Sequence, residues 1–96
     1  MIVKRLDTAL RDGDTIRAVI RATGTNQNGY TPLAVPSKDL QTRLIKDTYQ
    51  RAGLLLSKTK YFEAHGTGTA IGDPLEAMAI GNTFGPERDK DDPIIV

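Results

Sequence analysis

The sequence contains no cysteine among its 96 residues. This absence excludes disulfide bonds, thiolate metal sites and a cysteine nucleophile within the chain. An excess of one charge is also missing, because 13 basic residues nearly balance 12 acidic ones and the formal net charge is +1. The basic residues are scattered along the chain, so the sequence indicates neither a nucleic-acid partner nor attachment to an anionic membrane surface.

Long apolar runs are absent as well. None approaches the roughly 20 residues needed to cross a bilayer, and the N-terminus lacks the apolar core of a signal peptide. A cytoplasmic location is therefore the default expectation. With 39% hydrophobic residues, the chain is long enough for one domain at most. Because residues 1–3 and 93–96 are apolar, whereas domains usually end in polar segments, we expect a piece of a larger domain.

Alternating strand and helix patterns predict an α/β fold with a layered sheet. Residues 15–23 alternate between apolar and polar side chains, and residues 60–64 form a short apolar run, so both are predicted strands. The other predicted elements are a strand tail at 2–6, a short helix at 7–11, helices at 37–52 and 74–84, and a closing strand at 93–96. A loop at 24–36 joins the predicted strand at 15–23 to the predicted helix at 37–52, and Asn28-Gly29 is its sharpest predicted turn.

The helix predicted over residues 37–52 has recognisable signals at both ends. Ser37 is a favourable N-cap, and Gly53 is the expected left-handed stop. Between them, apolar residues recur at the spacing of one helix face, namely Leu40, Leu44, Ile45, Tyr49 and Ala52. This stripe predicts the side on which the helix packs.

Residues 60–76 are the most informative stretch. The predicted strand ends at His65, the only histidine of the chain, and glycines follow at 66, 68 and 72. Asp73 is the expected N-cap of the next helix, Pro74 its first residue, and Glu76 the partner of a capping box. A titratable ring at a strand end, on a glycine loop that leads into a helix, is where α/β folds build their sites.

The residues of this loop allow three other interpretations. Nucleotide binding is disfavoured because the glycine spacing is neither G-x-G-x-x-G nor that of a P-loop, and because Asp73 and Glu76 would face the phosphate. A metal site of His65, Asp73 and Glu76 matches no standard ligand spacing, so no metal is expected. A purely structural histidine remains open on the residues alone, although the position favours a functional one.

The motif Glu63-Ala-His-Gly-Thr-Gly-Thr69, followed by Gly72-Asp-Pro-x-Glu76, resembles the histidine motif of β-ketoacyl synthases. The resemblance is to ketosynthase domains of type I polyketide synthases in particular. It extends to Val19-Ile-Arg-Ala-Thr-Gly-Thr-Asn-Gln-Asn-Gly29, to Val35-Pro-Ser37 and to Tyr49-Gln-Arg-Ala-Gly53.

This resemblance implies a thiolase-like layered fold, in which two similar halves each hold a mixed sheet covered by helices. Residues 1–96 would form a partial ketosynthase domain, from the end of the N-terminal half to the start of the C-terminal half. They would lack the nucleophile elbow and the segment of the second histidine. The implied activity is that of an acyltransferase of the 3-oxoacyl synthase type, which joins acyl and malonyl thioesters by decarboxylative Claisen condensation in polyketide or fatty-acid biosynthesis.

The resemblance also implies roles for residues of the loop. His65 matches the first catalytic histidine. Thr67 and Thr69 match positions whose hydroxyls contact the phosphopantetheine arm of the acyl carrier, and Gly66 and Gly68 would let the backbone approach that arm. Two further positions, Asp73 and Glu76, are expected to support the site structurally.

The implied partners are other parts of the same synthase. They are an acyl carrier domain, the remaining ketosynthase segments and an acyltransferase domain, with a homodimer as the family's assembly. No cofactor is expected on this chain itself, and no nucleic acid or membrane. Because the nucleophile is missing, we expect the 96-residue chain alone to be inactive. Two alternatives are a non-catalytic remnant or interaction fragment of such a synthase and, less favoured because of the threonine-bearing loop, a thiolase-like degradative enzyme.

Overall fold

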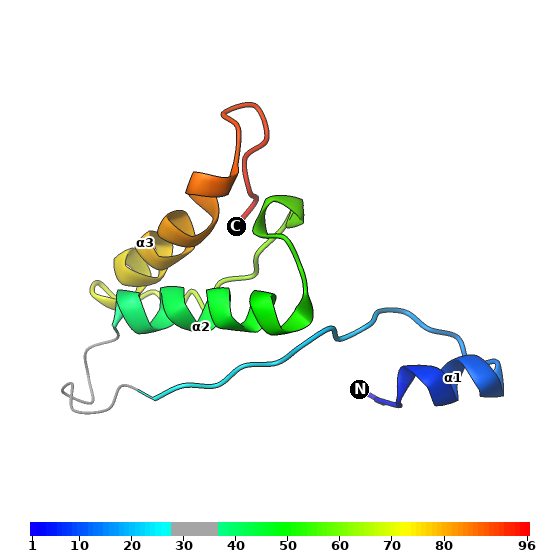
Figure 1. Cartoon of the computed structure of the whole chain (residues 1–96). Coiled ribbons are helices and arrows are strands. Elements are labelled where there is room, and N and C mark those ends of the chain that lie inside the picture. Colours follow the sequence, from blue (N-terminus) through cyan, green and yellow to red (C-terminus); the bar gives the residue numbers. More distant parts are fainter. Residues whose placement is uncertain (28–36) are drawn as a thin grey trace.

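The computed structural model describes residues 1–27 and 37–96. Within this part the α-helices are α1 (Leu6–Asp12), α2 (Lys38–Ala52) and α3 (Gly72–Phe84), and the short 3-10 helices are η1 (Leu56–Lys58) and η2 (Gly85–Glu87). Figure 1 shows α2 and α3 packed together with the C-terminal segment, while α1 lies apart at the far end of an extended connection. The turn predicted at Asn28-Gly29 lies outside the described residues.

Helix α2 confirms the predicted helix at both ends. The Ser37 hydroxyl accepts the N–H of Leu40 at 3.3 Å, as an N-cap does. At the other end Gly53 has φ 63°, and the N–H of Leu54 donates to the carbonyl of Tyr49 at 3.0 Å. This left-handed glycine with its six-residue bond is a Schellman ending, which satisfies a carbonyl that the helix leaves free.

The predicted start of α3 is wrong in its details. The helix begins at Gly72, Pro74 is its third residue rather than its first, and neither Asp73 nor Glu76 acts as a cap. Thr69 satisfies the helix start instead. Its Oγ1 accepts the N–H of Gly72 at 3.0 Å and its carbonyl accepts the N–H of Asp73 at 3.2 Å. The two carboxylates are unavailable for capping because both turn back to the preceding loop.

The predicted sheet is not confirmed in the described residues. Their only bridge outside helices is an isolated parallel pairing of Tyr61 with Ile95, in which the N–H of Phe62 donates to the Ile95 carbonyl at 2.9 Å and the N–H of Ile95 to the Lys60 carbonyl at 3.1 Å. Residues 14–27 run as an extended connection without a ladder, and residues 2–5 form no strand. A strand forms its backbone hydrogen bonds with an adjacent strand, and among the described segments these stretches have no such partner.

A small aromatic cluster joins α2, α3 and the segment before the histidine. Phe84 is 0% exposed, and its ring centroid lies 5.7 Å from that of Tyr49 and 5.6 Å from that of Phe62. Ala79 and Ile80 are buried on the same helix. Burial of a phenylalanine ring contributes about 1.5–3 kcal/mol, so this cluster stabilises the packing of α3 against α2.

The C-terminal loop is fastened by a buried arginine. The Arg88 side chain is 5% exposed, and its Nη1 donates to the Asp92 carbonyl at 2.7 Å and to its carboxylate at 3.2 Å. The same carboxylate pairs with the Lys60 ammonium at 2.6 Å. These contacts tie the loop after α3 to the segment that leads to His65.

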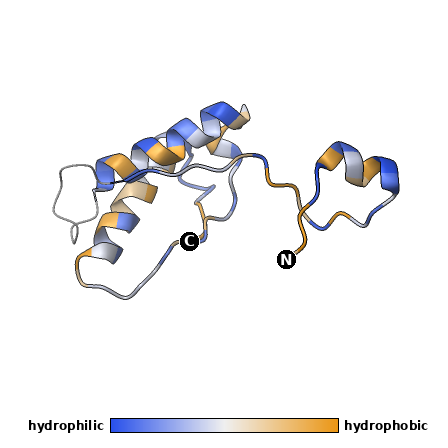
Figure 2. Cartoon of the chain, turned by 90° about the horizontal axis from the view of Figure 1, so that it is seen from below, coloured by the Kyte–Doolittle hydropathy of each residue, from blue (hydrophilic) through white to orange (hydrophobic). Residues whose placement is uncertain are grey.

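The N-terminal arm has little of its own core. In the first 20 residues only Ala9 is buried, and Figure 2 shows apolar residues along the arm without a covering layer. Its exposed large apolar residues are Met1, Ile2, Val3, Leu6, Leu10, Ile16, Val19 and Ile20. Apolar surface of this extent marks a contact region. None of the helices in the described part of the chain has the length and apolar character of a membrane span.

Candidate functional site

The loop between residues 65 and 72 turns at two glycines. Gly66 has φ 56° and Gly68 has φ 77°, both in the left-handed region that other residues adopt only with strain. The chain therefore folds back over the first turn of α3 directly after His65. This geometry places successive backbone N–H groups next to side chains of the helix that follows.

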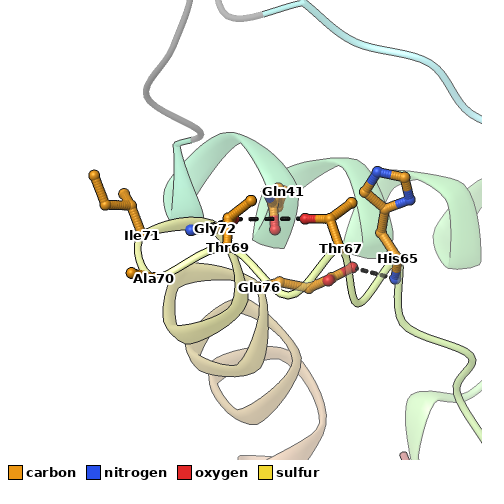
Figure 3. A pocket seen from close by; sticks show the side chains of 8 residues that line it. All are labelled: Gln41, His65, Thr67, Thr69, Ala70, Ile71, Gly72 and Glu76. Atoms are coloured by element: carbon orange, nitrogen blue, oxygen red, sulfur yellow. Dashed lines mark hydrogen bonds between the residues drawn. The ribbon is translucent and has the colours of Figure 1, made fainter.

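Glu76 holds the histidine end of this loop. Its Oε1 accepts the N–H of His65 at 2.7 Å and its Oε2 accepts the N–H of Gly66 at 3.0 Å. Bonds to an ionised carboxylate are stronger than bonds between neutral groups. Figure 3 shows the imidazole projecting from the loop away from the Glu76 carboxylate, so the backbone is fixed while the ring stays accessible.

Asp73 fastens the loop at a second point. Both of its carboxylate oxygens lie within hydrogen-bond distance of the N–H of Gly68, at 3.1 and 3.0 Å. Nearby, a Cβ on Gly72 would collide with Oγ1 of Thr69, so the hydroxyl reaches the Gly72 N–H only because residue 72 is a glycine. The loop is thus held by side chains from its own end and from the first turn of α3.

A cavity of about 390 Å³ opens beside this loop. It is lined by Gln41, His65, Thr67, Thr69, Ala70, Ile71, Gly72 and Glu76. The hydroxyls of Thr67 and Thr69 lie 3.5 Å apart on its wall (Figure 3). The cavity therefore combines an imidazole, two hydroxyls and a carboxamide, all of which form hydrogen bonds without carrying a fixed charge.

The structure brings together some of the residues that the sequence singled out, but not all. His65, Thr67, Thr69 and Glu76 line the cavity, whereas Gly66, Gly68 and Asp73 are not among the lining residues. Sequence reasoning missed Ala70, Ile71 and especially Gln41, which comes from α2. No local signal marks Gln41, because only the packing of α2 against α3 brings it to the loop.

The Glu76 carboxyl responds to two opposing effects. Partial burial raises its pKa, while the N–H groups of Gly66 and His65, together with the charge of the imidazole when protonated, lower it. The net result is a pKa below the ordinary value of 4.5. The carboxylate is therefore ionised at neutral pH and accepts both backbone bonds.

A pH titration should report this contact. Because the folded pKa is depressed, the stabilisation by Glu76 is present above pH 4.5 and is lost as the pH falls through the lower folded value. We expect the side-chain carboxyl carbon of Glu76 to titrate in NMR spectra with a midpoint below 4.5, accompanied by a shift of the Gly66 amide signal. The Glu76→Gln variant is the control, since its Gly66 amide should not titrate in this range. A midpoint at or above the ordinary value would contradict the contact.

Across residues 1–27 and 37–96, no group of three or more His, Asp or Glu side chains is arranged to hold an ion. The oxygens of Asp73 and Glu76 face backbone N–H groups instead.

Solved ketosynthases contain this arrangement of helices and loop. The ketosynthase from module 6 of the bacillaene synthase of Bacillus subtilis 168 superposes with a TM-score of 0.84 at 40% identity, over 91% of this chain and 16% of that one. A ketosynthase domain of the oxazolomycin synthase of Streptomyces albus superposes with a TM-score of 0.78 at 40% identity, over 86% of this chain and 14% of that one. The described fold is therefore part of a ketosynthase architecture.

The sequence leads to the same class. The family described as "Beta-ketoacyl synthase, C-terminal domain" matches residues 17–96, and the chain belongs to this family. It is 59% identical over 97 residues to the reducing polyketide synthase pksF of Alternaria solani and 54% identical over 97 residues to the highly reducing polyketide synthase alnA of Emericella nidulans. Each match covers 100% of this chain and 4% of the relative, so the chain spans only a small part of the length of these synthases. The resemblance to polyketide synthases is confirmed.

Proposed function

We propose that the chain supplies the first histidine segment of a ketosynthase active site that condenses acyl and malonyl thioesters in polyketide biosynthesis. One observation carries this proposal. His65 and the hydroxyls of Thr67 and Thr69 line a single open cavity, and the backbone of the histidine is anchored by Glu76. A structural histidine would not need an accessible ring beside a cavity.

In the proposed reaction the imidazole of His65 donates an N–H hydrogen bond to the thioester oxygen of the malonyl group. The C–C bond to the malonyl carboxylate breaks and carbon dioxide leaves. The electron pair of the broken bond forms an enolate, and the hydrogen bond from His65 stabilises its oxyanion. The enolate carbon then attacks an acyl thioester on a cysteine that another segment supplies. The new C–C bond forms as the cysteine thiolate leaves.

The threonine hydroxyls are proposed to bind the phosphopantetheine arm that carries the malonyl group. Oγ1 of Thr69 accepts the N–H of Gly72 and lies 3.5 Å from Oγ1 of Thr67, so one of the two hydroxyls donates to the other and the second hydroxyl keeps its hydrogen for the arm. Thr67 lies beside it and offers a second hydroxyl. Gly66 and Gly68 contribute by turning the loop without a side chain that would narrow the arm's path.

The wider setting is part of the same proposal. Residues 1–96 would span the end of the N-terminal half and the start of the C-terminal half of a thiolase-like domain, whose mixed sheet would take up the extended stretches of this chain. The partners would be the remaining ketosynthase segments, an acyltransferase domain and a carrier domain, in a cytoplasmic homodimer. The apolar N-terminal arm supports this view because it requires a covering surface.

A segment exchange tests the proposed function. The segment that matches this chain in the Alternaria solani synthase would be replaced by residues 1–96, and formation of β-ketoacyl product would be measured with acyl and malonyl substrates. We expect the exchanged synthase to retain condensation activity, because the two segments are 59% identical over 97 residues. The isolated 96-residue chain, measured in parallel, should form no product because it has no cysteine. A folded dimeric exchanged synthase without activity would favour the non-catalytic alternative.

A further inference from the structure

Among the described residues, Gln41 is the one lining residue of the cavity that comes from α2, and the other lining residues lie between 65 and 76. The cavity therefore has two walls from segments that are separate in the sequence. Figure 3 shows the Gln41 side chain in front of α2, between Thr67 and Thr69. Figure 3 draws no hydrogen bond between the Gln41 carboxamide and the other residues that line the cavity.

The position of Gln41 is fixed by its helix. Its backbone N–H donates to the Ser37 carbonyl at 3.1 Å, within the capped first turn of α2. On the next residue, the Thr42 hydroxyl contacts the Ala79 carbonyl of α3 at 3.5 Å, and the Tyr49 and Phe84 rings pack further along. The carboxamide thus projects from α2, a helix packed against α3, and not from a loop.

The polar groups of the cavity select a neutral ligand. No lysine or arginine lines it, and both Glu76 oxygens accept backbone N–H groups. A phosphate would find no cation there. A secondary amide carries one donor and one acceptor, and a carboxamide complements both. A cavity of about 390 Å³ is also within the size range of small-molecule sites.

We propose that Gln41 is a positioning residue that hydrogen-bonds an amide group of the carrier arm from the α2 wall, while Thr67 and Thr69 bind the arm from the loop wall. This inference rests on the proposed condensation function and specifies which part of the arm the cavity takes. The phosphate end of the arm lies outside the cavity, and the amide-bearing end lies between the two walls.

The test uses the exchanged synthase and two malonyl donors. Malonyl-pantetheine contains the amides of the arm, whereas the malonyl thioester of ethanethiol contains none. Gln41→Met keeps the length and helix propensity of the side chain but removes its hydrogen bonds. We expect this variant to raise KM for malonyl-pantetheine about three- to tenfold, the value of one hydrogen bond, with kcat nearly unchanged. KM for the ethanethiol ester should stay the same.

Gln50→Met is the matched control. Gln50 lies on the same helix but lines a different cleft, so this substitution should change KM for neither donor. Thermal unfolding of all variants checks that the domain is intact. Equal effects of Gln41→Met on the two donors, or no effect on either, would overturn the role of Gln41 while leaving the condensation function standing. An exchanged synthase that uses neither donor would overturn the proposed function and the Gln41 role together.

Discussion

Replacement of His65 by alanine in the exchanged synthase is expected to lower kcat for condensation about 100- to 1,000-fold, the loss that follows removal of one oxyanion donor. The ring projects from a loop whose backbone is held by Glu76, so the substitution removes the imidazole without releasing the loop. The measurement is the rate of β-ketoacyl product formation at saturating malonyl donor. KM for the donor should change little, because the hydroxyls and the α2 wall are intact.

Two comparisons make this result specific. His65→Gln retains an N–H donor and should recover part of the lost rate. Glu63→Ala changes an exposed side chain two residues earlier and should leave the rate near that of the parent. A kcat for His65→Ala within about threefold of the parent would mean that the imidazole stabilises no developing charge, and the proposed mechanism would be wrong.

The second large effect is expected at Glu76. Alanine at this position leaves the N–H groups of His65 and Gly66 without their carboxylate, and each bond to a charged group is worth about 1.5–3 kcal/mol. We expect the 65–69 segment of the exchanged synthase to exchange its amide hydrogens about 100-fold faster and condensation to fall at least about tenfold. The measurement combines hydrogen–deuterium exchange with product formation.

The control for Glu76 is Glu87→Ala, because Glu87 is exposed on η2 and should affect neither reading. Glu76→Gln should lie between the parent and the alanine variant, since its single carbonyl oxygen replaces only one of two acceptors. If exchange in this segment is unchanged in Glu76→Ala, the carboxylate does not hold the loop. The position of the histidine would then need another cause.

The parts of the molecule that are predictable from the sequence are those that depend on local chemistry. The ends of α2 follow from a serine cap and a left-handed glycine, and both require only neighbouring residues. The turn after His65 likewise follows from its glycines. The same local rules failed for Asp73 and Glu76, because their carboxylates accept N–H groups of the preceding loop instead of capping the helix start.

Features that depend on distant segments could not be predicted. A period of two identifies an extended stretch such as residues 15–23, but the pairing of a strand depends on a neighbour elsewhere in the chain. In the sequence, nothing distinguishes Gln41 from the other polar residues of its helix. It lines the cavity because α3 packs against that helix. The cavity is thus a tertiary feature, although most of its residues are contiguous.

The buried ring of Phe84 links the stability of the domain to the site, although it lies outside the cavity. The Phe84 ring on α3 packs against Tyr49 of α2, the helix that carries Gln41, and against Phe62, which precedes the histidine loop, and it does not line the cavity. Shrinking that ring would leave a void in this cluster and weaken the packing of the two helices that carry the walls of the cavity. A substitution at Phe84 could therefore lower activity either by altering donor binding or by destabilising the domain. An activity screen would not distinguish these two effects, whereas measuring both KM for the donor and thermal unfolding would.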